Sequence, residues 1–253
     1  MRILQAFILV QVSLAEYETK EYWDSKYASQ RAPYQWLQSE ENIRKALTHF
    51  WGPAGGAARI KSIVELGFGS SRMSPNVFYN DSSIGFGQPR TITAVDYSEV
   101  AFKNMLEAYP ADEHVGLHFV RDDLIDFLLG LNSSTRTVDF YFDSSVLDTL
   151  LISCGSMKVR EVVVPLLYQT LDSEHGVWLT VTYSRPDDRV PIFSGQPWAA
   201  IHACYTGERN NHLIFMMKGT GIARAKESKY ELGHMRCWNT AEPDAAPPAK
   251  EEL

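Results

Sequence analysis

Residues 60–71 read Ile60-Lys61-Ser62-Ile63-Val64-Glu65-Leu66-Gly67-Phe68-Gly69-Ser70-Ser71. A run of branched apolar residues is typical of a buried strand in a parallel sheet, and this run passes directly into Gly-x-Gly. Glycines let the backbone turn sharply and leave room for a ligand to approach the main chain. The pattern predicts a nucleotide-type cofactor at the carboxyl end of this strand, and a tight turn that binds nothing is the alternative.

The residues around the two glycines separate the cofactor classes. A dinucleotide site reads G-x-G-x-x-G, and its third glycine lets the following helix pack closely on the strand. Arg72 stands at that third position, which disfavours a dinucleotide. Glu65 lies two residues before Gly67, and an acid there suits the positively charged amino-acid end of S-adenosylmethionine. We therefore expect S-adenosylmethionine to bind at Glu65, Gly67 and Gly69.

Strand-like runs alternate with helix-compatible segments along the chain. Such alternation predicts βαβ units and a mostly parallel, Rossmann-like α/β sheet with helices on both faces. The last two runs suit an antiparallel pair that closes the sheet. The predicted strands cover residues 60–66, 91–96, 117–121, 138–143, 176–183, 198–205 and 212–218, and residues 158–171 form one of the helices.

Several of these strands end in acids. In an open α/β sheet the ligand lies over the carboxyl ends of the strands, so we expect these acids at the cofactor. An ionised Asp96 would accept hydrogen bonds from both ribose hydroxyls. Asp122 or Asp123 would face the adenine amino group, and Asp143 would face the amino-acid end or the incoming substrate. Because Asp favours helix N-caps, capping is the alternative role, above all for Asp122 or Asp123.

The composition is that of an ordinary globular protein. The chain has 253 residues, of which 45% are hydrophobic and 22% charged, which fits one domain with extensions. Its net charge of −7 argues against a nucleic-acid partner. Its three cysteines are too few and too scattered for a disulfide framework. His202 with Cys204, and His234 with Cys237, have loosely metal-like spacings, but without a second pair of thiols we predict no metal site.

Both ends of the chain resemble targeting signals. Residues 1–15 combine a positive start, an apolar stretch and small residues, as a signal peptide does, and are too short to anchor the protein across a membrane. An amphipathic helix is the alternative. The last four residues, 250–253, read K-E-E-L, one acid-for-acid change away from the K-D-E-L retrieval signal. Together the two ends predict the lumen of the endoplasmic reticulum, with the cytoplasm as the alternative.

Six segments between residues 17 and 221 match motifs of one enzyme family. They are 22–27 (YWDSKY, for Y-W-D-x-x-Y), 33–37 (PYQWL, for P-Y-x-W-F), 67–71 (GFGSS, for G-C-G-N-S), 95–98 (VDYS, for V-D-Y-S), 143–150 (DSSVLDTL, for D/E-K-G-T-L-D-x-L) and 198–219, for the closing strands that run from a Trp to H-K-G. As a set they resemble the seven-strand, S-adenosylmethionine-dependent lysine methyltransferases of elongation factor 1-alpha.

This resemblance implies a methyltransferase domain at residues 16–222 with an N-terminal helical lid, between the signal-like residues 1–15 and a peripheral, largely disordered tail at 223–253. It implies a protein substrate with an acceptor lysine, such as a translation factor. Asp143 would orient the lysine ammonium as the catalytic residue. The cofactor would also contact Tyr22, Trp23, Tyr34 and Trp36 in the lid, and Tyr97.

One departure from the family falls beside the site of methyl transfer. Ser144 and Ser145 replace the family's lysine-glycine pair, which leaves the methyl acceptor open. The alternatives are a small-molecule methyltransferase, an aminopropyltransferase of the spermidine-synthase type, or a catalytically inactive module that binds the cofactor. For the N-terminal aromatic residues, the alternative role is packing of a helix on the sheet.

Overall fold

A computed structural model of the chain describes residues 19–30, 32–52, 56–205, 211–221, 229–232 and 235–240. The signal-like residues 1–15 and the K-E-E-L sequence lie outside these ranges. Within the ranges, no helix has both the length and the apolar character that a membrane crossing requires.

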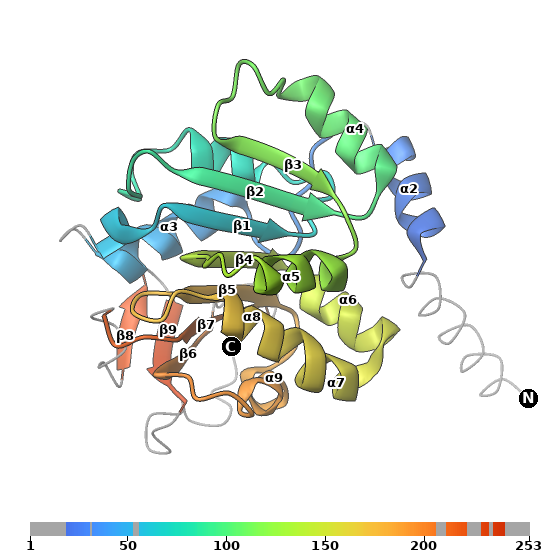
Figure 1. Cartoon of the computed structure of the whole chain (residues 1–253). Coiled ribbons are helices and arrows are strands. Elements are labelled where there is room, and N and C mark those ends of the chain that lie inside the picture. The colour runs from blue at the N-terminus through green and yellow to red at the C-terminus, as the bar shows by residue number, and fades with distance from the viewer. Residues whose placement is uncertain are drawn as a thin grey trace, which may run out of the picture.

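The centre of the fold is a single sheet of nine strands in the order β3-β2-β1-β4-β5-β7-β6-β9-β8 (Figure 1). Neighbours among the first five are parallel, and β7, β6, β9 and β8 continue antiparallel. The predicted fold class is confirmed, and the first seven strands form where the sequence predicts them. They are β1 (Ser62–Leu66), β2 (Thr91–Asp96), β3 (Leu117–Arg121), β4 (Phe140–Ser144), β5 (Val177–Thr182), β6 (Ala200–Tyr205) and β7 (His212–Met217).

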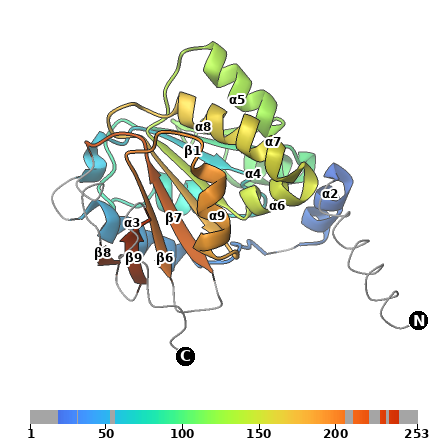
Figure 2. The same ribbon diagram turned by 90° about the horizontal axis from the view of Figure 1, so that it is seen from below.

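Helices cover both faces of this sheet, as Figure 2 shows. Alternate residues of a strand point to opposite faces, so Ile63 joins the cluster under α3 (Glu40–Trp51), whereas Val64 joins the cluster under α5 (Leu124–Ser133) and α8 (Val164–Thr170). The other helical segments are α2 (Lys20–Ser29), η1 (Gly56–Arg59), η2 (Met73–Tyr79), α4 (Glu99–Ala108), α6 (Val146–Ser153), α7 (Gly155–Lys158), η3 (Val159–Val163) and α9 (Pro186–Phe193).

Two strands that the sequence does not predict extend the sheet beyond β6. These are β8 (Lys229–Leu232) and β9 (Met235–Asn239), and they fall inside the segment 223–253 that was expected to be a peripheral, largely disordered tail. Both are short, and β9 is ordered by pairing with β6, more than thirty residues earlier. A pattern within residues 229–239 therefore could not reveal them.

A disulfide joins this added pair of strands to the rest of the sheet. Cys204 of β6 and Cys237 of β9 lie directly opposite each other and are bonded, at a sequence separation of 33. The chain thus has a disulfide where we expected no disulfide framework. The metal-like spacings of these cysteines to nearby histidines have a different explanation, because both thiols are used by the crosslink.

Candidate functional site

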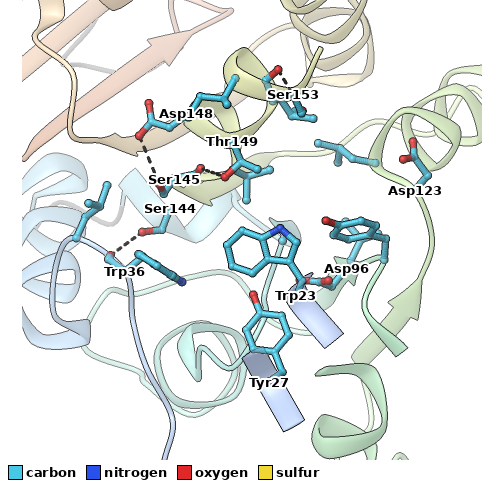
Figure 3. Close-up of a pocket in the computed structure, with 18 of the residues that line it drawn as sticks. Trp23, Tyr27, Trp36, Asp96, Asp123, Ser144, Ser145, Asp148, Thr149 and Ser153 are labelled. Atoms are coloured by element: carbon cyan, nitrogen blue, oxygen red, sulfur yellow. Dashed lines mark hydrogen bonds between the residues drawn. The ribbon is translucent and has the colours of Figure 1, made fainter. Parts of the chain in front are cut away.

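A pocket of about 500 Å³ lies at the carboxyl ends of the parallel strands, a size typical of ligand sites. Its walls come from the ends of β1, β2 and β4, from α6, and from α2 with the segment that follows it (Figure 3). The strand arrows of Figure 1 point toward α2, so the lid helix lies at the edge of the sheet where α/β proteins bind ligands.

The glycine turn after β1 forms one part of the pocket. Gly67 has a φ of +63° and Gly69 a φ of +51°, a left-handed backbone that favours glycine. A Cβ on Gly67 would lie 2.3 Å from the Val146 side chain, and one on Gly69 would lie 2.4 Å from the Tyr27 hydroxyl. Both glycines are therefore required by conformation and by space, and Gly67 itself lines the pocket.

Asp96, at the end of β2, lies beside this turn and lines the pocket. Its Oδ2 accepts a hydrogen bond from the Gly69 N–H at 2.8 Å, and its Oδ1 accepts one from the Ser98 N–H at 2.8 Å. Burial raises the pKa of Asp96 to about 6, against the lowering effect of these two donors. The next residue, Tyr97, also lines the pocket and is half-buried.

Asp122 and Asp123 follow β3, and both line the pocket. The Asp123 carboxylate caps α5, accepting hydrogen bonds from the backbone N–H groups of Ile125 at 2.8 Å and Asp126 at 3.4 Å. Asp122 accepts one from the N–H of Asp123 at 2.9 Å and does not cap the helix. The capping alternative therefore holds for Asp123, and Asp122 is the better placed of the two to contact a ligand.

Two predicted site residues, Glu65 and Asp143, do not line the pocket. Glu65 is 2% exposed and accepts hydrogen bonds from the Ser71 hydroxyl and the Ser74 N–H, so it holds the loop after the glycine turn. Asp143 is 1% exposed and accepts hydrogen bonds from the Leu147 N–H and from Trp178 Nε1. Burial raises the pKa of each carboxyl to about 7.

The structure therefore does not bring Asp143 to the pocket, where the predicted catalytic role would need it. Side chains alternate along a strand, so Asp143 shares the face of Tyr141, in the cluster that contains Trp178, while its neighbour Ser144 reaches the pocket. A shift of one residue along the strand therefore decides which side chain can contact a ligand. Glu65 likewise lies outside the pocket lining and supports the loop instead.

The N-terminal aromatic residues divide into two groups. Trp23 and Trp36 line the pocket, whereas Tyr22 and Tyr34 do not. Tyr27, which the sequence analysis missed, lines it as well, with its ring stacked on that of Trp23 at 5.7 Å between centroids. Its spacing four residues after Trp23 places both on one face of α2, a signal that was available in the sequence.

A second wall of the pocket comes from α6 and the residues before it, beginning beside the glycine turn, where Val146 lies against Gly67. Ser144, Ser145, Asp148 and Thr149 line the pocket here (Figure 3). All four fall inside the motif of residues 143–150, but Asp148 and Thr149 were not predicted as site residues. Ser145 has a φ of +70°, the left-handed conformation, at the position where the similar family has glycine. Tyr183, at the end of β5, completes this wall.

Charge in the pocket has one sign. Among the residues that the structure describes, the charged ones in the lining are Asp96, Asp122, Asp123 and Asp148, with no lysine, arginine or histidine. Asp148 is paired with the buried Arg189, and it also accepts a hydrogen bond from the Thr182 hydroxyl at 2.6 Å. The uncompensated negative charge therefore lies on the side of the glycine turn and the β2 and β3 ends.

A second group of polar side chains lies at the other end of the strands, before β4 and β5 begin. Asp139, Asp172 and His175 bring potential metal ligands within 4.8 Å of one another. These residues make hydrogen bonds within the protein. Asp139 Oδ2 accepts hydrogen bonds from the N–H groups of Lys61 and Ser62. Asp172 Oδ1 accepts one from the N–H of His175. This group fastens the start of β4 to its neighbours.

Neither a protein-family model nor a curated protein matches the chain. Among solved structures, it is similar to human methyltransferase-like protein 13 in complex with SAH, at 14% identity and a TM-score of 0.54, over 72% of this chain and 84% of that one. It is similar to WbdD, a bifunctional kinase-methyltransferase, at 12% identity and a TM-score of 0.50, over 78% of this chain and 47% of WbdD. At such identities the likeness establishes the fold, which is the Rossmann-like fold of methyltransferases.

Proposed function

We propose that this protein is an S-adenosylmethionine-dependent methyltransferase. One observation carries the proposal: three features line the same pocket. They are the glycine turn at Gly67, the buried carboxylate of Asp96 and an aromatic wall made of Trp23, Tyr27 and Trp36. The methyltransferase fold that the chain shares with solved enzymes supports it.

The described residues suit this cofactor in three respects. Asp96 offers a carboxylate to the ribose hydroxyls, and Asp122 offers one to the adenine amino group. The bare backbone of Gly67 lines the pocket and allows close approach of the amino-acid end. The aromatic rings of Trp23 and Trp36 line the pocket and suit a cation, as the ammonium of Lys26 shows by lying 5.1 Å and 3.9 Å from their centroids.

When bound, S-adenosylmethionine supplies an electrophilic methyl group, and transfer is an in-line displacement that needs no nucleophile from the protein. The residues of this chain contribute positioning and the exclusion of water. For the acceptor we propose a lysine of a protein substrate, as the motif resemblance implies. A negative pocket with aromatic walls supports an acceptor that arrives as a cation.

A second candidate, a small-molecule acceptor, is favoured by one observation. Asp148 is the acid on the wall formed by Ser144, Ser145 and Tyr183, and its charge is already paired with Arg189. This wall therefore offers hydroxyl and apolar groups to the acceptor, which suits an uncharged molecule as well as a deprotonated amine.

The test begins with binding and proceeds to transfer. We expect calorimetry to detect SAH binding by the full chain, and Gly67→Arg to abolish it without loss of the folded circular dichroism spectrum. Incubation with radiolabelled S-adenosylmethionine and fractionated lysate then distinguishes the acceptors: label in protein, located on lysine by mass spectrometry, supports the first candidate, and label in low-molecular-weight fractions supports the second. Undiminished SAH binding by Gly67→Arg would contradict the site.

For the compartment, we propose the lumen of the endoplasmic reticulum. The Cys204–Cys237 disulfide supports it, because disulfides persist in oxidising compartments and are rare in the cytosol. The signal-like residues 1–15 and the K-E-E-L end agree with it. A reporter fused to residues 1–20 should become protected from protease in microsomes, and exposure of the reporter would favour the cytoplasm.

A further inference from the structure

Two consecutive backbone carbonyls beside the pocket are held by side chains from distant parts of the chain. The Ser144 hydroxyl, at the end of β4, donates a hydrogen bond to the carbonyl oxygen of Trp36 at 2.7 Å. The side-chain amide of Asn211, just before β7, donates one to the carbonyl oxygen of Leu37, also at 2.7 Å. The sheet thus fastens the segment 36–37 at two points, and Figure 3 shows the first of them.

The fastened segment is strained. Leu37 has a φ of +66°, a left-handed conformation that a leucine adopts only when its surroundings impose it. The Trp36 carbonyl accepts a second hydrogen bond, from the N–H of Gln38 at 2.7 Å, which tightens the turn. Since this conformation is unfavourable by itself, the two side-chain donors help to stabilise it, together with the N–H of Gln38.

An aromatic wall extends from this segment to the glycine turn. The Trp36 ring meets the Trp23 ring edge to face at 6.2 Å, and Trp23 stacks on Tyr27. Tyr27 in turn lies against Gly69, where it occupies the space of a Cβ. Trp23, Tyr27 and Trp36 all line the pocket, so the position of the segment determines the position of its aromatic side.

We infer that Ser144 and Asn211 are positioning residues that hold residues 36–37 as a latch on the lid of the pocket. While both hydrogen bonds are made, the aromatic wall covers the bound nucleoside cofactor. When they break, the strained segment relaxes and the pocket opens for exchange. This inference rests on the proposed function in one respect, that the ligand under the lid is S-adenosylmethionine or its product SAH.

The family resemblance does not supply this role, because Ser144 stands where the similar enzymes have lysine. A serine hydroxyl is short and can reach a carbonyl only at close range, and here the backbone of Trp36 provides one. The contact is therefore a property of this chain, and Ser144→Ala is the variant that removes it with the least change in volume.

The test combines ligand dissociation with hydrogen exchange of the ligand-free protein. Loss of one neutral hydrogen bond corresponds to about a threefold to tenfold change, so we expect Ser144→Ala to release SAH about threefold to tenfold faster in stopped-flow tryptophan fluorescence. The association rate should change less. We expect Ser144→Thr, which keeps a hydroxyl, to restore slow release, and Asn211→Ala to accelerate release as Ser144→Ala does.

Ser194→Ala is the matched control, because it also removes a serine hydroxyl that donates to a backbone carbonyl, that of Pro191 at 2.9 Å, on an exposed surface away from the pocket. In the ligand-free protein, peptides covering residues 34–38 should exchange amide hydrogen about threefold to tenfold faster in Ser144→Ala than in Ser194→Ala. Equal exchange in the two variants refutes the latch, whether or not SAH binds. Absence of SAH binding by the unmodified protein would instead refute the proposed function. The latch would then be judged by amide hydrogen exchange in Ser144→Ala and Ser194→Ala alone.

Discussion

Replacing Asp148 with alanine should lower the free energy of unfolding by about 3–5 kcal/mol, the usual cost of removing one partner of a buried ion pair. Asp148 is 1% exposed and Arg189 is 8% exposed. The guanidinium of Arg189 donates to Asp148 Oδ1, and the Thr182 hydroxyl donates to the same oxygen at 2.6 Å. Alanine would leave a buried positive charge without its carboxylate and remove the acceptor of the hydroxyl.

For a chain of this size each kcal/mol corresponds to about 2–4 °C in Tm, so the expected loss is about 6–20 °C, measured by thermal and urea unfolding. Asp187→Ala is the matched control, since Asp187 also pairs with an arginine, Arg185, but at 3.4 Å and on the surface. Such exposed pairs contribute about 1 kcal/mol or less. The double variant Asp148→Leu with Arg189→Met should recover much of the stability, because it leaves neither charge buried. If Asp148→Ala proves no more costly than Asp187→Ala, the pair does not stabilise this wall of the pocket.

Three further predictions concern the pocket itself. Gly67→Ala should weaken SAH binding at least tenfold by calorimetry, because its φ of +63° and the 2.3 Å approach of a neighbouring side chain leave a Cβ no place, and unchanged affinity would contradict this geometry. Ser145→Gly should raise stability by about 0.5–1 kcal/mol, since relief of a left-handed φ gives about 1–2 kcal/mol and the added freedom of the unfolded chain subtracts about 0.4–1 kcal/mol; a lower Tm for this variant would show that the serine side chain stabilises more than the strain costs. SAH affinity should fall as pH drops below about 6, where Asp96 becomes protonated and can no longer accept both ribose hydroxyls. Asp96→Asn should bind more weakly and flatten this dependence, and a wild-type profile that stays flat from pH 8 to 5 would argue against an ionised Asp96 in binding.

The sequence predicts well what depends on local pattern. The strand of residues 91–96 and that of residues 117–121 form with the predicted bounds, because alternating apolar residues and turn signals lie within each segment. The left-handed glycines Gly67 and Gly69 follow from the same kind of signal, since the backbone requirement is carried by the residue itself. Asp96 reaches the pocket for a related reason, because its strand ends beside that turn.

What the sequence could not show depends on contacts between distant residues. The Asp148–Arg189 pair spans 41 residues, and the hydrogen bond from Ser144 to Trp36 spans 108. No local pattern marks either partner. Asp143 lies outside the pocket lining for a subtler reason: the end of its strand was predictable, but the face on which the last side chains point depends on the register of the whole sheet.

The Ser144-Ser145 pair gains a different meaning once the structure is considered. Taken as a loss of the lysine-glycine pair of the similar family, the two serines put methyl transfer to lysine in doubt. In the structure Ser145 keeps the left-handed backbone that glycine would adopt, with a φ of +70°, so the geometry of the turn survives the substitution. Ser144 makes a contact of its own, to the backbone of the lid. Ser145 therefore adopts a backbone conformation that glycine favours, and Ser144 places a short hydroxyl where the similar family has a long cation. We expect a change of that kind to affect the choice of methyl acceptor more than the binding of the cofactor. Cofactor binding and acceptor identity therefore have to be tested separately.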